Sequence, residues 1–239
     1  MLSIFAKKLD CAQPLRETAA APQVRPARPT DVPCIVQLQM ISLPHFPLPE
    51  PSRAFLQTFY GFVVRQRQGR LLVSEHNRSL AGFVLGASDP TSLCQQVASD
   101  RSHLLTAASV CLVRRPVQLP RLLRELRGLR RLPDNRTVSV AAGYELVTIA
   151  VQPRLRRQGH GKALIQALAA AARHEQMTRL CIHLAANDKT MASFYEHLGF
   201  TAFRSFKAVD GRWMDEYVMA LPGSLEPAVS NRRAMPFAA

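Results

Sequence analysis

The sequence lacks any apolar run long enough to cross a membrane. Residues 104–113 form an uncharged, mostly apolar stretch, but a transmembrane helix needs about 20 such residues. The first ten residues also lack the apolar core and the cleavage pattern of a secretory signal. We therefore expect a cytoplasmic protein.

Acidic residues are scarce, with 17 Asp and Glu against 31 Lys and Arg, which gives a net charge of +14. Most of the excess is arginine, whose forked donors suit phosphate groups. Such a charge favours an anionic partner: a phosphate-bearing small molecule, nucleic acid or an acidic membrane surface. A genome rich in arginine codons would give the same composition, so charge alone does not choose among these partners.

Cysteine is sparse and scattered. The five cysteines show no C-x-x-C pair and no metal-ligand spacing; they are Cys11, Cys34, Cys94, Cys111 and Cys181. This pattern predicts free thiols in a reducing compartment and no metal site.

One stretch carries most of the chemical information. Residues 146–151 are apolar and rich in β-branched side chains, which predicts a strand that ends before Pro153. A basic, glycine-containing loop follows, and the apolar periodicity of residues 162–174 predicts a helix. The first N–H groups of a helix have no internal partner and favour an anion. Gly159 and Gly161 would let the backbone approach a phosphate closely.

This loop matches neither common phosphate-binding pattern. The Walker loop needs G-x-x-x-x-G-K-[ST] and the dinucleotide loop needs G-x-G-x-x-G, whereas the chain reads Arg156-x-x-Gly159-x-Gly161 after an Ile-Ala-Val strand. That arrangement resembles the acyl-CoA signature of the GNAT superfamily of N-acyltransferases.

Three other segments are similar to the same family. Residues 24–33 resemble its first strand and helix, with Ile35, Leu38 and Ile41 continuing at helical spacing. Residues 70–76 and 79–86 predict a hairpin that resembles the family's early strands. The sequence Phe194-Tyr195-x-x-x-Gly199-Phe200 resembles its closing motif.

The resemblance implies an α/β (α+β) GNAT fold with a mixed central sheet of six to seven strands flanked by helices. It also implies acetyl-CoA as co-substrate, with the loop amides on its diphosphate. The implied CoA-binding residues are Ile149, Ala150, Val151, Arg156, Arg157, Gln158, Gly159, His160, Gly161, Lys162, Asn187 and Asp188. Relatives usually have Asn where this chain has Asp188, so Asn187 and Asp188 either contact the pantetheine or only cap a helix.

The resemblance places Tyr195 against the thioester sulfur, where its phenol would protonate the departing thiolate as a general acid; alternatively, the ring simply packs beside Phe194. Glu145 begins the central strand, where relatives often carry a base for the amine; alternatively, a neighbouring arginine holds this carboxylate. A backbone N–H near Val151 would polarise the acyl carbonyl. We expect no nucleophilic role for Cys181, and solvent contact for His160.

The organisation predicted is a flexible leader at 1–22, a single acetyltransferase domain at 23–221 and a flexible tail at 222–239. Further helices are expected at 52–67, after Pro90 and at 188–198, with a strand at 178–184 and a final hairpin about Asp210 and Gly211. The proline-rich loop with His45 and Phe46 either borders the acceptor site or is solvated.

Residues 88–136 form a basic helical insertion, in which residues 101–136 hold nine arginines against two acidic residues. A helix is predicted at 121–131. The basic surface is a solvated face, an attractor for a phosphate-bearing ligand, or a contact for anionic membrane.

Two classes of function follow. The first is an N-acetyltransferase that moves acetyl from acetyl-CoA to a primary amine of a small molecule, such as an amino sugar, by direct attack in a ternary complex; a protein N-terminus or a lysine is the alternative acceptor. The second is a non-catalytic GNAT-like module that binds nucleic acid or anionic membrane through its Arg-rich helices. Nucleic acid is the less favoured partner. The sequence does not determine the oligomeric state.

Overall fold

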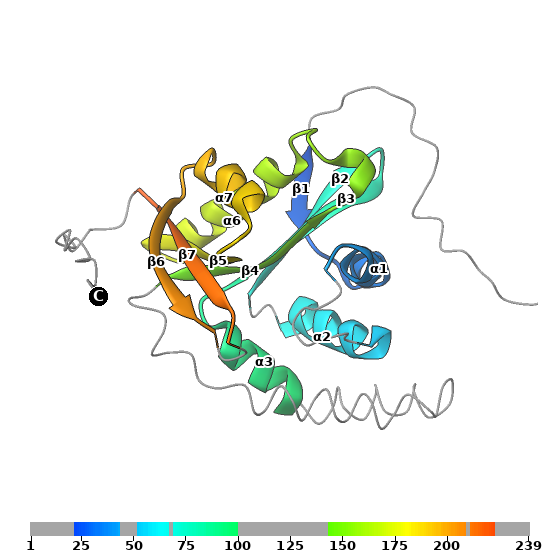
Figure 1. Ribbon diagram of the computed structural model, residues 1–239. Coiled ribbons are helices and arrows are strands. Elements are labelled where there is room, and N and C mark those ends of the chain that lie inside the picture. Colours follow the sequence, from blue (N-terminus) through cyan, green and yellow to red (C-terminus); the bar gives the residue numbers. More distant parts are fainter. Residues whose placement is uncertain (1–21, 44–51, 67–68, 100–142, 209–210, 223–239) are drawn as a thin grey trace, which may run out of the picture.

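The computed structural model describes residues 22–43, 52–66, 69–99, 143–208 and 211–222 (Figure 1). Several predicted features lie outside these residues: most of the leader, His45 and Phe46, the Arg-rich helix at 121–131 and nearly all of the tail.

A seven-stranded mixed sheet organises the described residues. Its spatial order is β1-β2-β3-β4-β5-β7-β6, and only β4 and β5 are parallel. The strands are β1 (Gln23–Pro26), β2 (Arg70–His76), β3 (Ser79–Ala87), β4 (Tyr144–Val151), β5 (Arg179–Ala185), β6 (Thr201–Lys207) and β7 (Trp213–Ala220). The predicted mixed sheet is therefore confirmed.

Helices cover both faces of the sheet (Figure 1). They are α1 (Val32–Ser42), α2 (Arg53–Gln66), α3 (Pro90–Ser99), α6 (His160–His174) and α7 (Lys189–Glu196), with short 3₁₀ turns η1 (Pro29–Asp31) and η4 (Pro153–Leu155). The core residues of α1, α2 and α3 share one cluster with Val73 and Phe83. Those of α6 and α7 share a second cluster with Leu72 and Val84.

The first cluster confirms the aromatic face predicted for α2. Phe55, Phe59, Phe62 and Val63 are all buried. On α1 the expected stripe is only partly buried, because Ile35 and Leu38 lie in the core while Ile41 is 65% exposed. Ile41 lies in the last turn of α1, where Gln39 takes a buried place and bonds to Tyr60 instead.

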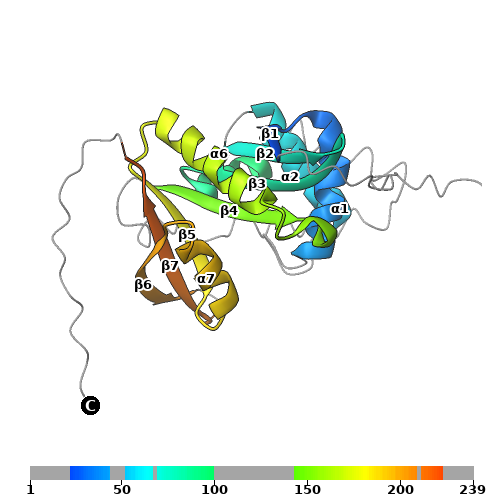
Figure 2. The ribbon, with the colours of Figure 1, turned by 90° about the horizontal axis from the view of Figure 1, so that it is seen from above.

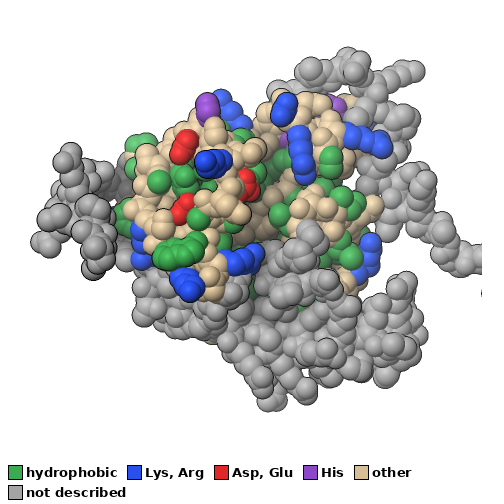
Figure 3. All heavy atoms as spheres, viewed as in Figure 1, with side chains coloured by type: hydrophobic (Ala, Val, Ile, Leu, Met, Phe, Trp, Pro, Cys, Tyr) green, Lys and Arg blue, Asp and Glu red, His purple; other side chains and the backbone are tan. Residues whose placement is uncertain are grey.

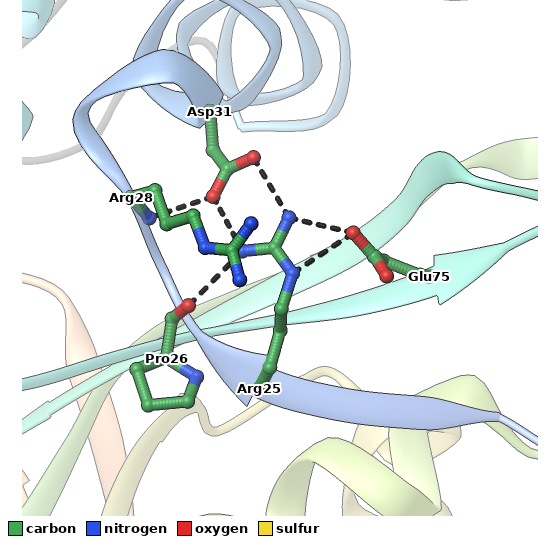
Figure 4. A network of polar contacts seen from close by, with 5 residues as sticks. All are labelled: Arg25, Pro26, Arg28, Asp31 and Glu75. Carbon is green, nitrogen blue, oxygen red and sulfur yellow. Dashed lines mark hydrogen bonds and ion pairs between the residues drawn. The ribbon is translucent and has the colours of Figure 1, made fainter.

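A charged clamp joins β1, η1 and β2 through the side chain of Arg25 (Figure 4). The guanidinium of Arg25 on β1 donates to Asp31 in η1 at 2.7 and 3.0 Å, and to Glu75 on β2 at 2.6 and 2.9 Å. Burial favours the neutral form of Asp31, but the bonds from Arg25 and from the Arg28 N–H outweigh it and lower the pKa of this carboxyl. The clamp fixes β1 against β2 where η1 leads into α1.

Strands β4 and β5 separate soon after they meet. They pair only at Tyr144 with Leu180 and at Glu145 with Cys181, although both strands continue well beyond. Figure 2 shows the two strands running apart. The backbone of β4 therefore has one edge open over most of its length, and this edge faces the gap.

A bulge at Val147 reverses the two sides of β4 within this gap. The register with β3 moves from Gly86–Leu146 to Leu85–Thr148, so Val147 is the additional residue. Before it, Tyr144 and Leu146 face the cluster with α6; after it, Ala150 faces the α1–α2 cluster and Ile149 faces α6.

Candidate active site

The end of β4 is fastened to β3. The backbone N–H of Gln152 donates to Ala81 O at 2.8 Å, and its side-chain amide donates to Leu80 O. Because successive N–H groups of an extended strand point to opposite sides, the N–H of Val151 points away from β3 and toward the gap. The geometry thus supplies the backbone donor expected near Val151.

The loop after η4 turns sharply into α6. Arg157 has φ 62° and Gly159, the N-cap of α6, has φ 86°. Both values lie in the left-handed region, which is costly for residues with a Cβ. The predicted helix is confirmed, but it begins at His160 and not at residue 162.

The backbone amides of this turn are open. Among the described residues, the N–H groups of residues 157–162 donate to no acceptor in the chain, and the next bond runs from Ala163 N to Gly159 O at 2.9 Å. Six consecutive donors therefore surround the positive end of the helix dipole, which is the arrangement that binds phosphate oxygens.

Basic side chains surround the open amides. Arg156, Arg157 and Lys162 are exposed, and Arg156 also donates from Nε to Val151 O at 3.4 Å. Gln158 is also exposed, and its side-chain amide donates to Arg154 O at 3.2 Å. The loop thus offers both main-chain donors and mobile positive charge to an anion.

His160 is buried beside the loop, so the expectation that it contacts solvent is wrong. The residue is 1% exposed, and its Nδ1 lies 2.8 Å from Ser74 Oγ on β2. Burial, and then the nearby ring of His76, lower the pKa of His160. A neutral imidazole therefore holds the first residue of α6 against the sheet, and its side chain points away from the open amides.

Three residues from separate elements meet beside these amides. A Cβ placed on Gly161 would lie 3.4 Å from the ring of Phe194 on α7 and 3.9 Å from Val151 Cγ2. The mouth of the gap is therefore bounded by the end of β4, the start of α6 and α7. In the space-filling view a hollow separates the two halves of the molecule, with basic side chains on both sides (Figure 3).

Tyr195 on α7 is 1% exposed and packs edge-on against Phe194 and Phe200. The ring packs beside Phe194, as the alternative expectation stated. No hydrogen bond of its hydroxyl occurs among the described residues. Burial, and then the charge of Asp188, raise the pKa of this phenol. The phenol therefore keeps its proton at neutral pH.

Asp188 serves as a helix cap. It is the N-cap of α7, and its carboxylate accepts from Met191 N at 3.0 Å. Asn187 is exposed beside it. The cap occupies one oxygen of Asp188, so the structure confirms the capping role and assigns Asn187 no contact of its side chain.

Glu145 lies at the last paired position before the strands separate. Among the described residues its ion-pair partner is a histidine, whereas the alternative expectation named an arginine: His183 Nδ1 lies 3.4 Å from Glu145 Oε1. Burial alone would lower the pKa of His183, but Glu145 and Glu216 outweigh it and raise the pKa to about 9. His183 is therefore an imidazolium at neutral pH.

The charged groups continue across the sheet. Glu216 on β7 lies opposite His183, with Oε1 3.9 Å from His183 Nε2, and it accepts from Arg204 Nε on β6 at 2.5 Å. We call Glu145, His183, Glu216 and Arg204 the charged row. Sequence reasoning missed its last three members, because they lie on three strands and no local motif contains them.

The charged row and Tyr195 occupy opposite faces of the sheet. Tyr195 belongs to the cluster with α6, as do Tyr144 and Leu146 on either side of Glu145 in β4. Glu145 therefore points to the other face, where its charge raises the pKa of Cys94 on α3.

The buried thiols near Glu145 are inert. Burial, then Glu216 and Glu145, raise the pKa of Cys181 to about 12. Cys94 is raised to about 12 by burial, Glu145 and Asp89. Since the thiolate is the nucleophilic form, the structure agrees with the expectation that Cys181 does not attack the acyl group.

The family comparison bears on the same segment of the chain. Residues 128–202 match the model of an acetyltransferase (GNAT) domain. This range contains β4, the open loop, α6, β5 and α7. No curated protein sequence matches the chain at a significant level.

Solved structures share the fold. A protein from Desulfovibrio desulfuricans assigned to the GNAT family of acetyltransferases has a TM-score of 0.54 at 16% identity, over 84% of this chain and 99% of its own. The Salmonella typhimurium protein yncA, assigned as an acetyltransferase and solved with acetyl-CoA, has a TM-score of 0.55 at 14% identity, over 88% and 100%. The ribosomal-protein-S18-alanine N-acetyltransferase from Escherichia coli has a TM-score of 0.51 at 14% identity, over 88% and 100%.

Within the described part of the chain, no helix has the length and apolarity that crossing a membrane would require. The matched domain, the separated strands and the open loop lie together in one fold. Residues 128–202 therefore match a GNAT acetyltransferase domain, and the chain shares the fold of the solved acetyltransferases.

Proposed function

We propose that this protein transfers an acetyl group from acetyl-CoA to a primary amine of a small molecule, by direct attack within a ternary complex. The observation that carries the proposal is the run of six unbonded amides at residues 157–162, next to the open edge of β4. A diphosphate fits the amides, and an extended pantetheine can follow the open strand edge as an additional strand would.

In this proposal the donor side uses the residues predicted from the sequence. The backbone of Ile149, Ala150 and Val151 would face the pantetheine, and the N–H of Val151 would donate to the acyl carbonyl. Arg156, Arg157 and Lys162 are exposed around the amides and would neutralise phosphate charge. Asn187 lies where α7 begins, and we propose that its side chain reaches the pantetheine.

The reaction needs a neutral amine, and an alkylammonium ion has a pKa of roughly 10. In our proposal Glu145 receives the ammonium group and takes its proton. The nitrogen then forms a bond to the acyl carbon, and the carbon–sulfur bond breaks. Tyr195, whose ring is buried and whose pKa is raised by that burial, gives its proton to the departing thiolate.

The acceptor side presents polar groups beyond Glu145. Thr148 Oγ1 and His183 Nε2 are buried and have no hydrogen-bond partner among the described residues. Buried orphan donors and acceptors are costly unless a ligand bonds to them. They support an acceptor that carries hydroxyl or carbonyl groups near its amine, and an amino sugar is our first choice.

The test is a panel of amines assayed with acetyl-CoA, in which release of free thiol is monitored. The panel contains amino sugars, polyamines, free lysine, and peptides with a free N-terminus or a lysine side chain. Turnover with small amines and none with peptides is the expected result. Preference for peptides would move the acceptor to a protein N-terminus or a lysine.

Absence of thiol release with every amine of the panel would overturn the enzyme proposal. Without thiol release for any amine, salt-dependent retention on heparin or on anionic liposomes would indicate the binding module instead. We place the protein in the cytoplasm, which agrees with the free cysteines Cys94 and Cys181 among the described residues.

A further inference from the structure

The charged row crosses four strands at the point where β4 and β5 separate. Glu145 pairs with Cys181, and His183 follows two residues later on the same face of β5. His183 pairs with Glu216, and Glu216 pairs with Arg204. Negative and positive groups alternate along the row, from the gap to the edge of the sheet.

The fold alone does not explain this row. Glu216 is 3% exposed, and taking such charges out of water costs more than apolar side chains of similar size would. The surrounding positions on β5 are apolar: Leu180, Ile182 and Leu184 are buried. Moreover, two donors remain unused, because His183 Nε2 and Arg204 Nη2 are buried without a hydrogen-bond partner among the described residues.

We propose that His183 is the final acceptor of the amine's proton, which it receives through Glu145, and that Glu216 and Arg204 are positioning residues that hold it in this role. The inference rests on the proposed acetyl transfer and deepens it. His183 Nδ1 lies 3.4 Å from Glu145 Oε1, and His183 follows Cys181, the strand partner of Glu145, by two residues along β5. The Glu216 carboxylate lies 3.9 Å from the other ring nitrogen, Nε2, and accepts a hydrogen bond from Arg204 Nε.

Proton affinities favour this route. Carboxylic acids are far stronger acids than alkylammonium ions, so a proton left on a carboxylate would lie well uphill. The pKa of His183 is raised to about 9 by its two glutamates, which is within about one unit of an alkylammonium ion at roughly 10. Transfer onward from Glu145 to His183 makes the removal of the proton almost balanced.

The steps balance in protons. The relay needs a neutral His183, a form that becomes abundant only as the pH rises toward 9. In this form the ammonium group of the acceptor binds to the Glu145 carboxylate. One proton passes from nitrogen to the Glu145 carboxylate and then to His183 Nδ1, which leaves the stable pair of carboxylate and imidazolium. After the attack the amine nitrogen loses a second proton. This proton replaces the one that Tyr195 gives to the thiolate. The His183 side chain is 24% exposed, so it returns its proton to solvent.

The charged and titratable groups around His183 come from several elements. They are Glu145 on β4, Cys181 on its own strand, Glu216 on β7 and Arg204 on β6, and the ring of Phe206 on β6 lies 5.1 Å away. Cys181 keeps its proton below pH about 12. Glu216 stays ionised because His183 and Arg204 outweigh its burial and lower its pKa. Among these groups, His183 therefore titrates nearest to pH 9.

The experiment compares Glu216→Gln with Asp215→Asn. Asp215 precedes Glu216 in β7, so its side chain points to the opposite face of the sheet. Its carboxylate accepts a hydrogen bond from Ser205 Oγ at 2.6 Å. Two quantities are measured for the full chain: the pKa of His183 by NMR titration, and kcat/KM against pH with the best amine of the panel. In Glu216→Gln both the pKa and the acid limb of the rate profile should move down by at least about one pH unit. Both should stay in place in Asp215→Asn.

Two results would overturn the relay: an unchanged acid limb in Glu216→Gln although the pKa of His183 falls, or an unchanged pKa of His183. If Glu216→Gln does not fold, His183→Asn carries the test, because it must abolish the limb near pH 9 and slow the reaction at least about tenfold. A wild-type protein that acetylates no amine would instead overturn the proposed function itself. An active protein with unaltered profiles in both variants would overturn only the relay.

Discussion

Ser74 Oγ on β2 lies 2.8 Å from Nδ1 of His160, the first residue of α6. This bond joins the loop with the open amides to a strand that is 86 positions away in the chain. Because His160 is buried and neutral, the position of the helix N-terminus depends on an imidazole that resists protonation.

We predict that acid weakens this junction. The pKa of His160 is lowered in the folded state from the ordinary 6.5, so its contribution to stability is present above pH 6.5 and is lost as the pH falls through 6.5 toward the lower folded value. His160→Asn keeps a polar atom near Nδ1 but cannot titrate. Its melting temperature should therefore fall less between pH 7 and pH 5 than that of the wild type.

The matched control is His174→Asn, at the opposite end of the same helix, where the side chain is exposed. Its acid sensitivity should equal that of the wild type. Equal sensitivity of the His160 variant and the wild type would show that this histidine is not the group that responds.

A second prediction concerns Gly159, whose φ of 86° is unfavourable for a residue with a Cβ. Among the described residues, a Cβ there meets only Pro22 Cγ, at 3.7 Å. The penalty therefore comes from the backbone and amounts to about 1–2 kcal/mol. Gly159→Val should therefore reposition the loop and weaken CoA binding at least about tenfold by calorimetry.

Gly61 supplies the comparison for this substitution. It lies inside α2, has no heavy atom within 4 Å of an added Cβ, and is not in the left-handed region. Gly61→Ala should bind CoA normally and gain up to about 1 kcal/mol of stability from helix propensity. Equal CoA affinity in Gly159→Val and the wild type would remove the loop from the binding site.

The elements near the loop could be predicted because their signals are local. The strand of β4, the glycines of the loop and the apolar face of α6 lie within some 30 residues, and each follows from spacing or turn chemistry. The capping role of Asp188 is equally local, since its partner Met191 is three residues away.

Long-range relations could not be read from the sequence. The burial of His160 depends on Ser74, and the role of Glu145 depends on His183 on another strand. The bulge at Val147 is a register shift relative to β3, which leaves no mark on the apolar pattern of β4. A buried polar group is predictable only once its partner has been placed beside it.

A third prediction tests the clamp at Arg25. Replacing Arg25 with Met leaves Asp31 and Glu75 without their shared cation, at side-chain exposures of 14% and 29%. A largely buried carboxylate without its cation is costly. We therefore expect the free energy of unfolding, measured in urea, to fall by about 2–3 kcal/mol. Arg173→Met on α6 removes an exposed arginine and should change stability by less than about 0.5 kcal/mol. Losses of equal size would mean that the clamp contributes nothing specific.

The fourth prediction separates the chemistry of Tyr195 from its packing. Tyr195→Phe keeps the ring contacts with Phe194 and Phe200 and removes only a hydroxyl that has no protein partner among the described residues. Folding stability should therefore hardly change. Loss of the proton donor should lower kcat about a hundredfold or more with little effect on KM.

Tyr60→Phe is the opposite case and serves as the control. The Tyr60 hydroxyl donates to Gln39 Oε1 at 3.0 Å in the α1–α2 core. Its removal should cost about 1 kcal/mol in unfolding free energy and leave kcat unchanged. If Tyr195→Phe were instead destabilised and fully active, the phenol would be a packing group, and the proton of the thiol would have to come from water.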